Sequence, residues 1–136
     1  MQYTVKERFL KYVQVDTQAD PMSSSFPSSE KQKNLTAIIC DELTKMNIPF
    51  TTNDAGYIYA KLAANSTNKV PKIFFCAHLD TAPDCSGTNV KPIVHHNYQG
   101  QDIILPDDKN VVLSPVHHPN LLDKKGHDII TASGLT

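Results

Sequence analysis

The sequence predicts an α/β fold with a mixed sheet flanked by helices, and three observations carry this prediction. Apolar residues recur at helical spacing near the N-terminus and again after residue 30. Short runs of β-branched and aromatic residues, bounded by turn-forming residues, begin at residue 50. The run at residues 72–79 is almost continuously apolar, which is typical of a central strand buried on both faces.

The first expected element is a helix over about residues 5–15. Thr4 and Glu7 stand at capping-box spacing, so each is expected to satisfy a backbone N–H at the helix start. Val5 and Phe9 then begin an apolar stripe on one helical face.

A second helix is expected after a loop rich in proline and serine at residues 20–27. Ser28 or Ser29 is its expected N-cap, and Asn47 suits its C-terminal end. Its apolar stripe comprises Leu35, Ile38, Ile39, Leu43 and Met46.

Two short strands, residues 50–52 and 57–62, are expected to form a hairpin through the turn residues 53–56. A polar loop over residues 64–69 then leads to the apolar strand, which ends at His78.

Beyond that strand we expect a long loop to about residue 92, of the kind that borders functional sites. Residues 94–98 and 102–105 are predicted to flank a short hairpin-like connection. Residues 119–125 predict a brief helix that Gly126 stops.

The last predicted strand covers residues 128–131, followed by a turn at 132–134. Residues 135–136 are expected to begin a return strand, so that the chain would stop within a hairpin. An unpaired sheet edge of this kind predicts self-association.

Composition limits the class of protein. A chain of 136 residues is one domain or part of one. Thirteen basic and fourteen acidic residues give a net charge of -1 without a long basic run, so neither a nucleic acid nor a membrane is an expected partner. The three cysteines form no CxxC pair, and no apolar run approaches the ~20 residues of a membrane helix. We therefore expect a cytoplasmic protein with reduced thiols.

The most informative pattern is His78-Leu79-Asp80 at the carboxyl end of the apolar strand, where α/β enzymes place their chemistry. Side chains two apart in a strand share a face, so Asp80 can reach and orient the imidazole of His78. Cys76 lies on the same face and would complete a Cys/His/Asp triad, but a lone cysteine in a buried strand is expected to pack.

The other candidate ligands are expected to be surface residues. The pairs His95-His96 and His117-His118 place neighbours on opposite faces, so neither pair can readily hold one ion. The Asp107-Asp108 pair follows a proline in a predicted turn, where acids are usually solvated. No nucleophile elbow and no glycine-rich phosphate loop is present in the sequence.

Residues 76–81, Cys-Ala-His-Leu-Asp-Thr, resemble the first metal motif of the dinuclear zinc exopeptidases related to aminoacylase and carboxypeptidase G. Further segments are similar to the peptidase T branch of that family, the tripeptide aminopeptidases. These segments are residues 7–13 with 16–18, residues 82–92, residues 97–100 with 102–103, and residues 112–116. The resemblance extends over essentially the whole chain.

The resemblance implies that residues 1–136 form the N-terminal part of a catalytic, zinc-binding domain. The implied enzyme releases the N-terminal residue of tripeptides with two zinc ions and an activated water. His78 would ligate one zinc, and Asp80 would be the catalytic-site acid that orients it.

In the family, the bridging aspartate, the glutamate base, the remaining ligands and a lid or dimerisation domain lie further downstream. Asp107-Asp108 is rejected as the bridging site because it precedes residues 112–116 and lacks an Ala-Gly continuation. We therefore expect the 136-residue chain alone to be inactive.

Two alternatives from other functional classes remain open. The chain can be a non-enzymatic remnant that acts as an interaction or regulatory module. It can also be a mononuclear metal sensor built from Cys76, His78 and Asp80, for which zinc binding would depend on Cys76.

Overall fold

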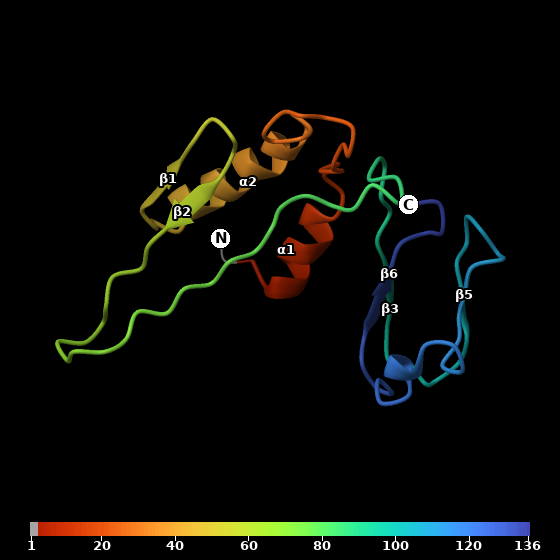
Figure 1. Ribbon diagram of the computed structural model, residues 1–136. Helices are drawn as coiled ribbons and strands as arrows, with labels where there is room; N and C mark the ends of the chain where they lie inside the picture. The colour runs from red at the N-terminus through yellow and green to blue at the C-terminus, as the bar shows by residue number, and fades with distance from the viewer. Residues whose placement is uncertain (1–2) are drawn as a thin grey trace. The chain divides into compact units, whose positions relative to one another are not determined.

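The computed structural model describes residues 3–136, which divide into two compact units. Residues 17–83 form the first unit. Residues 3–16 together with residues 84–136 form the second unit. Both contain helices and strands, as expected for the α/β class (Figure 1). The strands form two-stranded antiparallel sheets with the orders β1-β2, β3-β6 and β4-β5.

The first unit is built on helix α2 (Gln32–Lys45). Its C-terminus is closed by a Schellman motif, in which the Ile48 N–H donates to the Leu43 carbonyl at 2.9 Å. Asn47 takes the left-handed conformation that this motif requires, with φ 55°. The predicted role of Asn47 at the helix end is therefore confirmed.

The predicted N-cap of α2 is wrong. Lys31 occupies the cap position and its side chain makes no capping hydrogen bond. Ser28 instead places its hydroxyl within 3.1 Å of the Asp20 N–H and 3.2 Å of the Gln32 amide. The Ser28 hydroxyl thus stabilises the preceding loop instead of capping the helix. Its partner Asp20 lies eight positions earlier, and capping-residue spacing does not reveal such a contact.

The hairpin of β1 (Phe50–Thr52) and β2 (Ile58–Ala60) is confirmed, with Thr51 opposite Tyr59. Its turn is held against α2 by the Thr36 hydroxyl, which donates to the Gly56 carbonyl at 3.0 Å. Gly56 has φ +83°, and a Cβ there would lie 3.1 Å from the Thr36 hydroxyl oxygen. Glycine therefore suits both the turn and the close approach of the helix.

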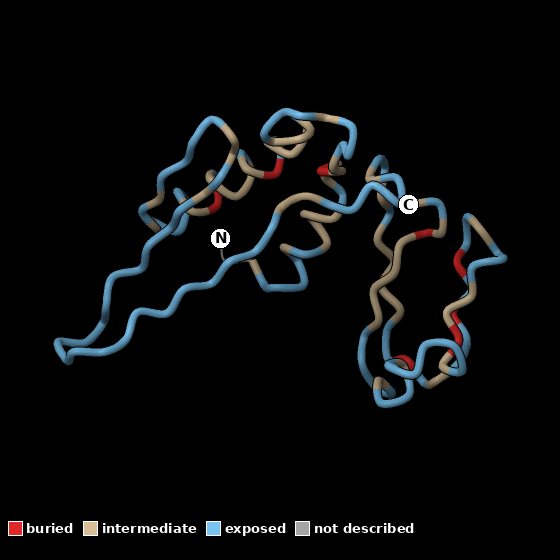
Figure 2. The backbone as a smooth tube through the Cα atoms, in the orientation of Figure 1, coloured by how far each residue is buried: buried red, intermediate tan, exposed pale blue. Residues whose placement is uncertain are grey.

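The predicted strand over residues 72–78 is not observed. No strand is assigned between residues 61 and 92, and residues 61–78 are exposed, as the pale blue tube of Figure 2 shows. Cys76 is exposed as well, so the expectation that it packs in a core is wrong. A strand that is apolar on both faces needs a neighbour on each side, and no described segment pairs with this one.

Helix α1 (Val5–Tyr12) opens the second unit, three residues shorter than predicted. Its capping box is confirmed, because the Glu7 N–H donates to the Thr4 hydroxyl oxygen at 3.2 Å and the Thr4 N–H donates to the Glu7 carboxylate at 2.6 Å. No residue of α1 is buried.

The predicted hairpin between residues 94–98 and 102–105 is wrong. Strand β3 (Ile93–His95) pairs with β6 (Ile129–Thr131), whereas β4 (Ile103–Ile104) pairs with β5 (Val112–Leu113). The β6 strand was predicted, but its partner is not residues 135–136, which form no strand. The predicted helix near residue 119 is the shorter 3-10 turn η1 (Pro119–Leu121).

The buried cluster of the second unit consists of Tyr98, Ile103 and Leu105. Tyr98 is fully buried and connects two segments through its backbone, since its N–H donates to the His127 carbonyl at 2.9 Å and its carbonyl accepts from the Gly126 N–H at 2.7 Å. Its hydroxyl has no hydrogen-bond partner among the described residues. Within residues 3–136, no helix is long and apolar enough to cross a membrane.

Candidate metal-binding site

His78 and Asp80 form the pair that the sequence predicts. The Nδ1 atom of His78 lies 3.1 Å from Oδ1 of Asp80. The His78 side chain is 82% exposed and the Asp80 side chain 44% exposed, so the pair lies at the surface of the first unit. Asp80 therefore orients the imidazole without removing it from solvent.

The pairing determines which imidazole nitrogen can bind a metal. When Nδ1 carries the proton and donates it to Asp80, Nε2 of His78 bears the free lone pair. A neutral imidazole with its second nitrogen held by a carboxylate is the usual form of a zinc-ligating histidine. The residues present therefore fit one ligand position of a zinc site.

Thr81, directly after Asp80, is tied to the N-terminal part of the first unit. Its N–H donates to the Thr17 carbonyl at 3.2 Å, and its carbonyl accepts from the Ala19 N–H at 2.9 Å. These bonds form a parallel bridge between Gln18 and Thr81. Thr17 is only 2% exposed, so the anchor rests on a buried residue.

The anchor was not predicted from the sequence. Gln18 adds a side-chain bond, donating from Nε2 to the Pro83 carbonyl at 3.1 Å. Residues 17–19 and 81 are far apart in the chain, and only an explicit strand alignment would have suggested their pairing. The hollow beside the anchor is lined in part by Gln18, Lys31 and Pro83, but not by His78 or Asp80.

No further ligand joins the pair in the described part of the chain. No group of three or more His, Cys, Asp or Glu residues is arranged there to hold a metal ion. Cys76 has a free, exposed thiol. The arrangement thus provides one histidine ligand and its orienting acid.

The other histidines and the aspartate pair have separate surroundings in the second unit. His95 lies 3.0 Å from the Thr131 hydroxyl through Nε2, whereas His96 contacts Asp128, so the two neighbours point to different partners as predicted. His117 and His118 are exposed. Asp107 and Asp108 lie in the β4–β5 connection, where Asp108 Oδ1 accepts from the Asn110 N–H at 3.0 Å.

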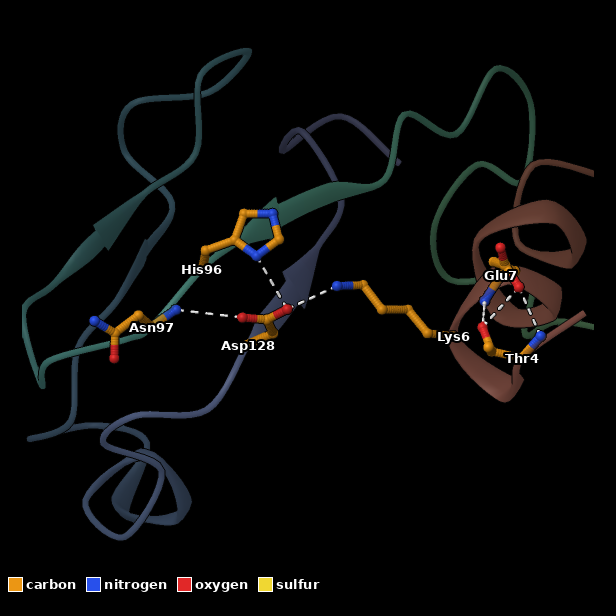
Figure 3. Close-up of polar contacts among 6 residues, drawn as sticks. All are labelled: Thr4, Lys6, Glu7, His96, Asn97 and Asp128. Carbon is orange, nitrogen blue, oxygen red and sulfur yellow. Dashed lines mark hydrogen bonds and ion pairs between the residues drawn. The ribbon is translucent and has the colours of Figure 1, made fainter.

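A polar cluster around Asp128 was missed by the sequence reasoning (Figure 3). Its Oδ2 atom lies 2.7 Å from Lys6 Nζ and 3.0 Å from His96 Nδ1, while Oδ1 accepts from the Asn97 N–H at 3.3 Å. Asp128 precedes β6 and His96 follows β3, so antiparallel pairing of these strands brings them together. The charged residues of this cluster can be read from the sequence, but only the pairing of β3 with β6 shows that His96 and Asp128 lie together.

Comparison with known proteins places the chain in a family, although no protein-family model matches it. Peptidase T of Desulfitobacterium hafniense strain Y51 is 47% identical over 133 residues, which is 98% of this chain and 32% of that protein. Peptidase T of Geobacillus sp. strain WCH70 is 47% identical over 137 residues, and that of Listeria monocytogenes serotype 4a is 46% identical over 137 residues. Each of these two matches covers 100% of this chain and 33% of the relative.

The chain thus spans about a third of the length of the curated relatives it matches. The similarity covers His78, Asp80 and the Thr81 anchor, because it extends over essentially all of the sequence. The resemblance seen in the sequence motifs is confirmed, and the chain belongs to the peptidase T family.

Proposed function

We propose that this chain is the N-terminal, zinc-binding part of the catalytic domain of a cytoplasmic aminopeptidase that releases the N-terminal residue of tripeptides. The observation that carries the proposal is the 3.1 Å contact between His78 Nδ1 and Asp80 Oδ1 in a member of the peptidase T family. Cys40, Cys76 and Cys85 form no disulfide in the described part of the chain, which is in keeping with a reducing compartment.

In this proposal His78 ligates one of two zinc ions through Nε2. A bound zinc ion lowers the pKa of its water to about 7 and polarises the scissile carbonyl. Asp80 keeps the proton on Nδ1 of His78, which leaves the Nε2 lone pair available and fixes the plane of the ring. Asp80 is therefore a positioning residue.

The Thr81 anchor has a supporting role in this arrangement. Its two backbone hydrogen bonds to Thr17 and Ala19 fix the chain one residue after Asp80. A ligand held close to an anchored backbone needs less ordering when the metal binds.

The isolated chain is proposed to be inactive, because a dinuclear site needs about three protein ligands for each metal. The described residues provide His78 but no group of three candidate ligands. The remaining ligands, the general base and any lid domain would come from sequence outside these 136 residues.

Zinc titration followed by NMR of the histidine ring protons tests the proposal on the purified chain. We expect the ring-proton signals of His78 to shift at the lowest zinc concentration. In His78→Ala we expect zinc binding by the chain to be lost. His117→Ala is the matched control, because His117 is also exposed but lies outside the site. Zinc binding that persists in His78→Ala and is lost in His117→Ala would contradict the assignment.

Tripeptide hydrolysis tests the second part of the proposal. The chain with added zinc should release no N-terminal residue above the level of a zinc-only blank. A stoichiometric, metal-dependent turnover by the chain would refute the proposed inactivity without affecting the ligand assignment. Loss of zinc affinity in Cys76→Ala would instead favour the mononuclear sensor.

A further inference from the structure

The side chain of Gln18 binds the segment that follows the His78–Asp80 pair. Its Nε2 atom donates to the Pro83 carbonyl at 3.1 Å, across 65 positions of sequence. Both residues belong to the first unit. Gln18 therefore holds the chain three positions after Asp80.

The backbone alone cannot extend the bridge that begins at Thr81. Thr81 bonds residues 17–19 in parallel fashion. The next two bonds of such a ladder would need an N–H at residue 83 and an N–H at residue 21, the latter donating to the carbonyl of residue 83. Residues 21 and 83 are both proline, which has no N–H. The carboxamide of Gln18 supplies the donor that the ladder lacks.

The segment that carries Gln18 is itself held within the first unit. The Asp20 N–H donates to the Ser28 hydroxyl oxygen at 3.1 Å, and the same oxygen accepts from Nε2 of Gln32 at 3.2 Å. Gln32 is the first residue of the 14-residue helix α2. Residues 17–20 are thereby connected to the start of a helix, and a group that bonds to them shares this support.

We propose that Gln18 is a positioning residue for metal binding by His78, an inference that rests on the proposed role of His78 as a zinc ligand. The bridge at Thr81 fixes one point of the chain and leaves the segment free to pivot about it. The Gln18 contact fixes a second point two residues further on, at Pro83. Two fixed points set the direction in which the chain passes the bridge.

The effect reaches His78 through the backbone of residues 78–81. Asp80 directly precedes Thr81, and its Oδ1 atom lies 3.1 Å from Nδ1 of His78. This contact depends on an extended backbone, which brings the two side chains to one face. When the C-terminal end of the segment is fixed at two points, fewer backbone conformations compete with the extended one. Less ordering is then required when zinc binds.

Zinc titration of Gln18→Met tests this role on the complete 136-residue chain. Methionine is unbranched and of similar length, but it carries no N–H donor and adds no charge near the metal. We expect the zinc concentration that half-saturates the shift of the His78 ring protons to rise about three- to tenfold, the cost of ordering one flexible segment.

Gln14→Met is the matched control. Nε2 of Gln14 donates to the Leu10 carbonyl at 2.7 Å, so this variant loses the same kind of hydrogen bond. Gln14 belongs to the second unit and is four positions from Gln18 in the sequence. The control should keep the zinc response of the unmodified chain.

The nitrogen chemical shifts of the His78 ring distinguish positioning from a merely structural role. At about pH 8 and without zinc, the Asp80 contact favours the tautomer with the proton on Nδ1. In Gln18→Met we expect a smaller fraction of this tautomer than in Gln14→Met, while the urea midpoints of the two variants stay equal.

A zinc affinity and a tautomer fraction equal to those of Gln14→Met would overturn the inference. Changes in Gln18→Met that appear only together with a lower urea midpoint would overturn it too, because they assign Gln18 a structural role. If His78 of the unmodified chain fails to respond to zinc, the proposed function is overturned instead. The tautomer comparison needs no zinc and would still decide the role of Gln18.

Discussion

Lys6 of helix α1 and Asp128, next to strand β6, form an ion pair with Nζ 2.7 Å from Oδ2, although they are 122 residues apart in the sequence. The Lys6 ammonium, the Asn97 N–H and the His96 ring together lower the pKa of Asp128 from 3.8 to about 2. A carboxylate that receives three contacts on the charged form resists protonation. This pair ties α1 to the β3–β6 sheet within the second unit.

The Asp128 cluster predicts a specific acid sensitivity. The folded-state pKa lies below the ordinary value, so the stabilisation is fully present above about pH 4 and is lost as the pH falls toward 2. The carboxyl carbon of Asp128, followed by NMR, should titrate with a midpoint near 2. In Asp128→Asn the pH dependence of unfolding between 4 and 2 should be shallower.

Asp102→Asn, at an exposed position, is the control for that experiment. It should leave the acid dependence close to that of the unmodified chain. A midpoint near 4 for Asp128 in the folded chain would show that the cluster does not hold the charged form.

The capping box predicts the effect of Thr4→Ala. The Thr4 hydroxyl accepts the Glu7 N–H, and the Glu7 carboxylate accepts from Thr4, which lowers the pKa of Glu7. Removal of the hydroxyl should cost about 1 kcal/mol of stability, as for other N-caps. Urea unfolding monitored by circular dichroism measures this loss. Thr4→Ser retains the hydroxyl and should lose much less.

The Tyr98 hydroxyl predicts an unusual substitution result. Because this buried oxygen has no hydrogen-bond partner among the described residues, Tyr98→Phe should be neutral or stabilise the chain by up to about 1 kcal/mol. Tyr98→Ala should instead cost about 3 to 5 kcal/mol, because it leaves a cavity beside Ile103 and Leu105. Thermal and urea unfolding distinguish the two variants. A loss of more than 1 kcal/mol in Tyr98→Phe would mean that the hydroxyl has a partner.

The His78–Asp80 contact predicts that Asp80→Asn weakens zinc binding at His78 by about 10- to 100-fold. The amide cannot accept the Nδ1 proton as strongly as a carboxylate, so Nε2 becomes a weaker ligand. Asp84→Asn, in the exposed loop that follows, is the matched control. Equal zinc affinity in the two variants, measured by titration calorimetry, would refute the orienting role of Asp80.

Features that depend on nearby residues were predictable. The Thr4–Glu7 capping box, the β1–β2 hairpin and the position of Asn47 follow from spacings of a few residues. The His78–Asp80 contact belongs to the same class, since an extended backbone brings alternate side chains to one face.

Features that depend on the choice between distant partners were not predictable. The sequence around residues 94–105 is compatible with a local hairpin, but β3 and β4 each pair with a strand that comes later in the chain. The Thr17–Thr81 anchor and the Lys6–Asp128 pair likewise join segments that are far apart. Segment 72–78 was expected in a core because a single sequence reports apolarity and does not report whether a partner is present.

The anchor at Thr81 also sets a limit on the reach of His78. His78 comes three positions before Thr81, so a fully extended chain carries His78 no more than about 10 Å from Thr81. An ion bound by His78 is thereby confined to a small sphere around the buried Thr17 contact, whatever path residues 61–77 take. Within that sphere the effective concentration of the His78 imidazole is that of a group on a short tether. Any second metal ligand placed there would therefore join His78 on the same ion in an intramolecular step.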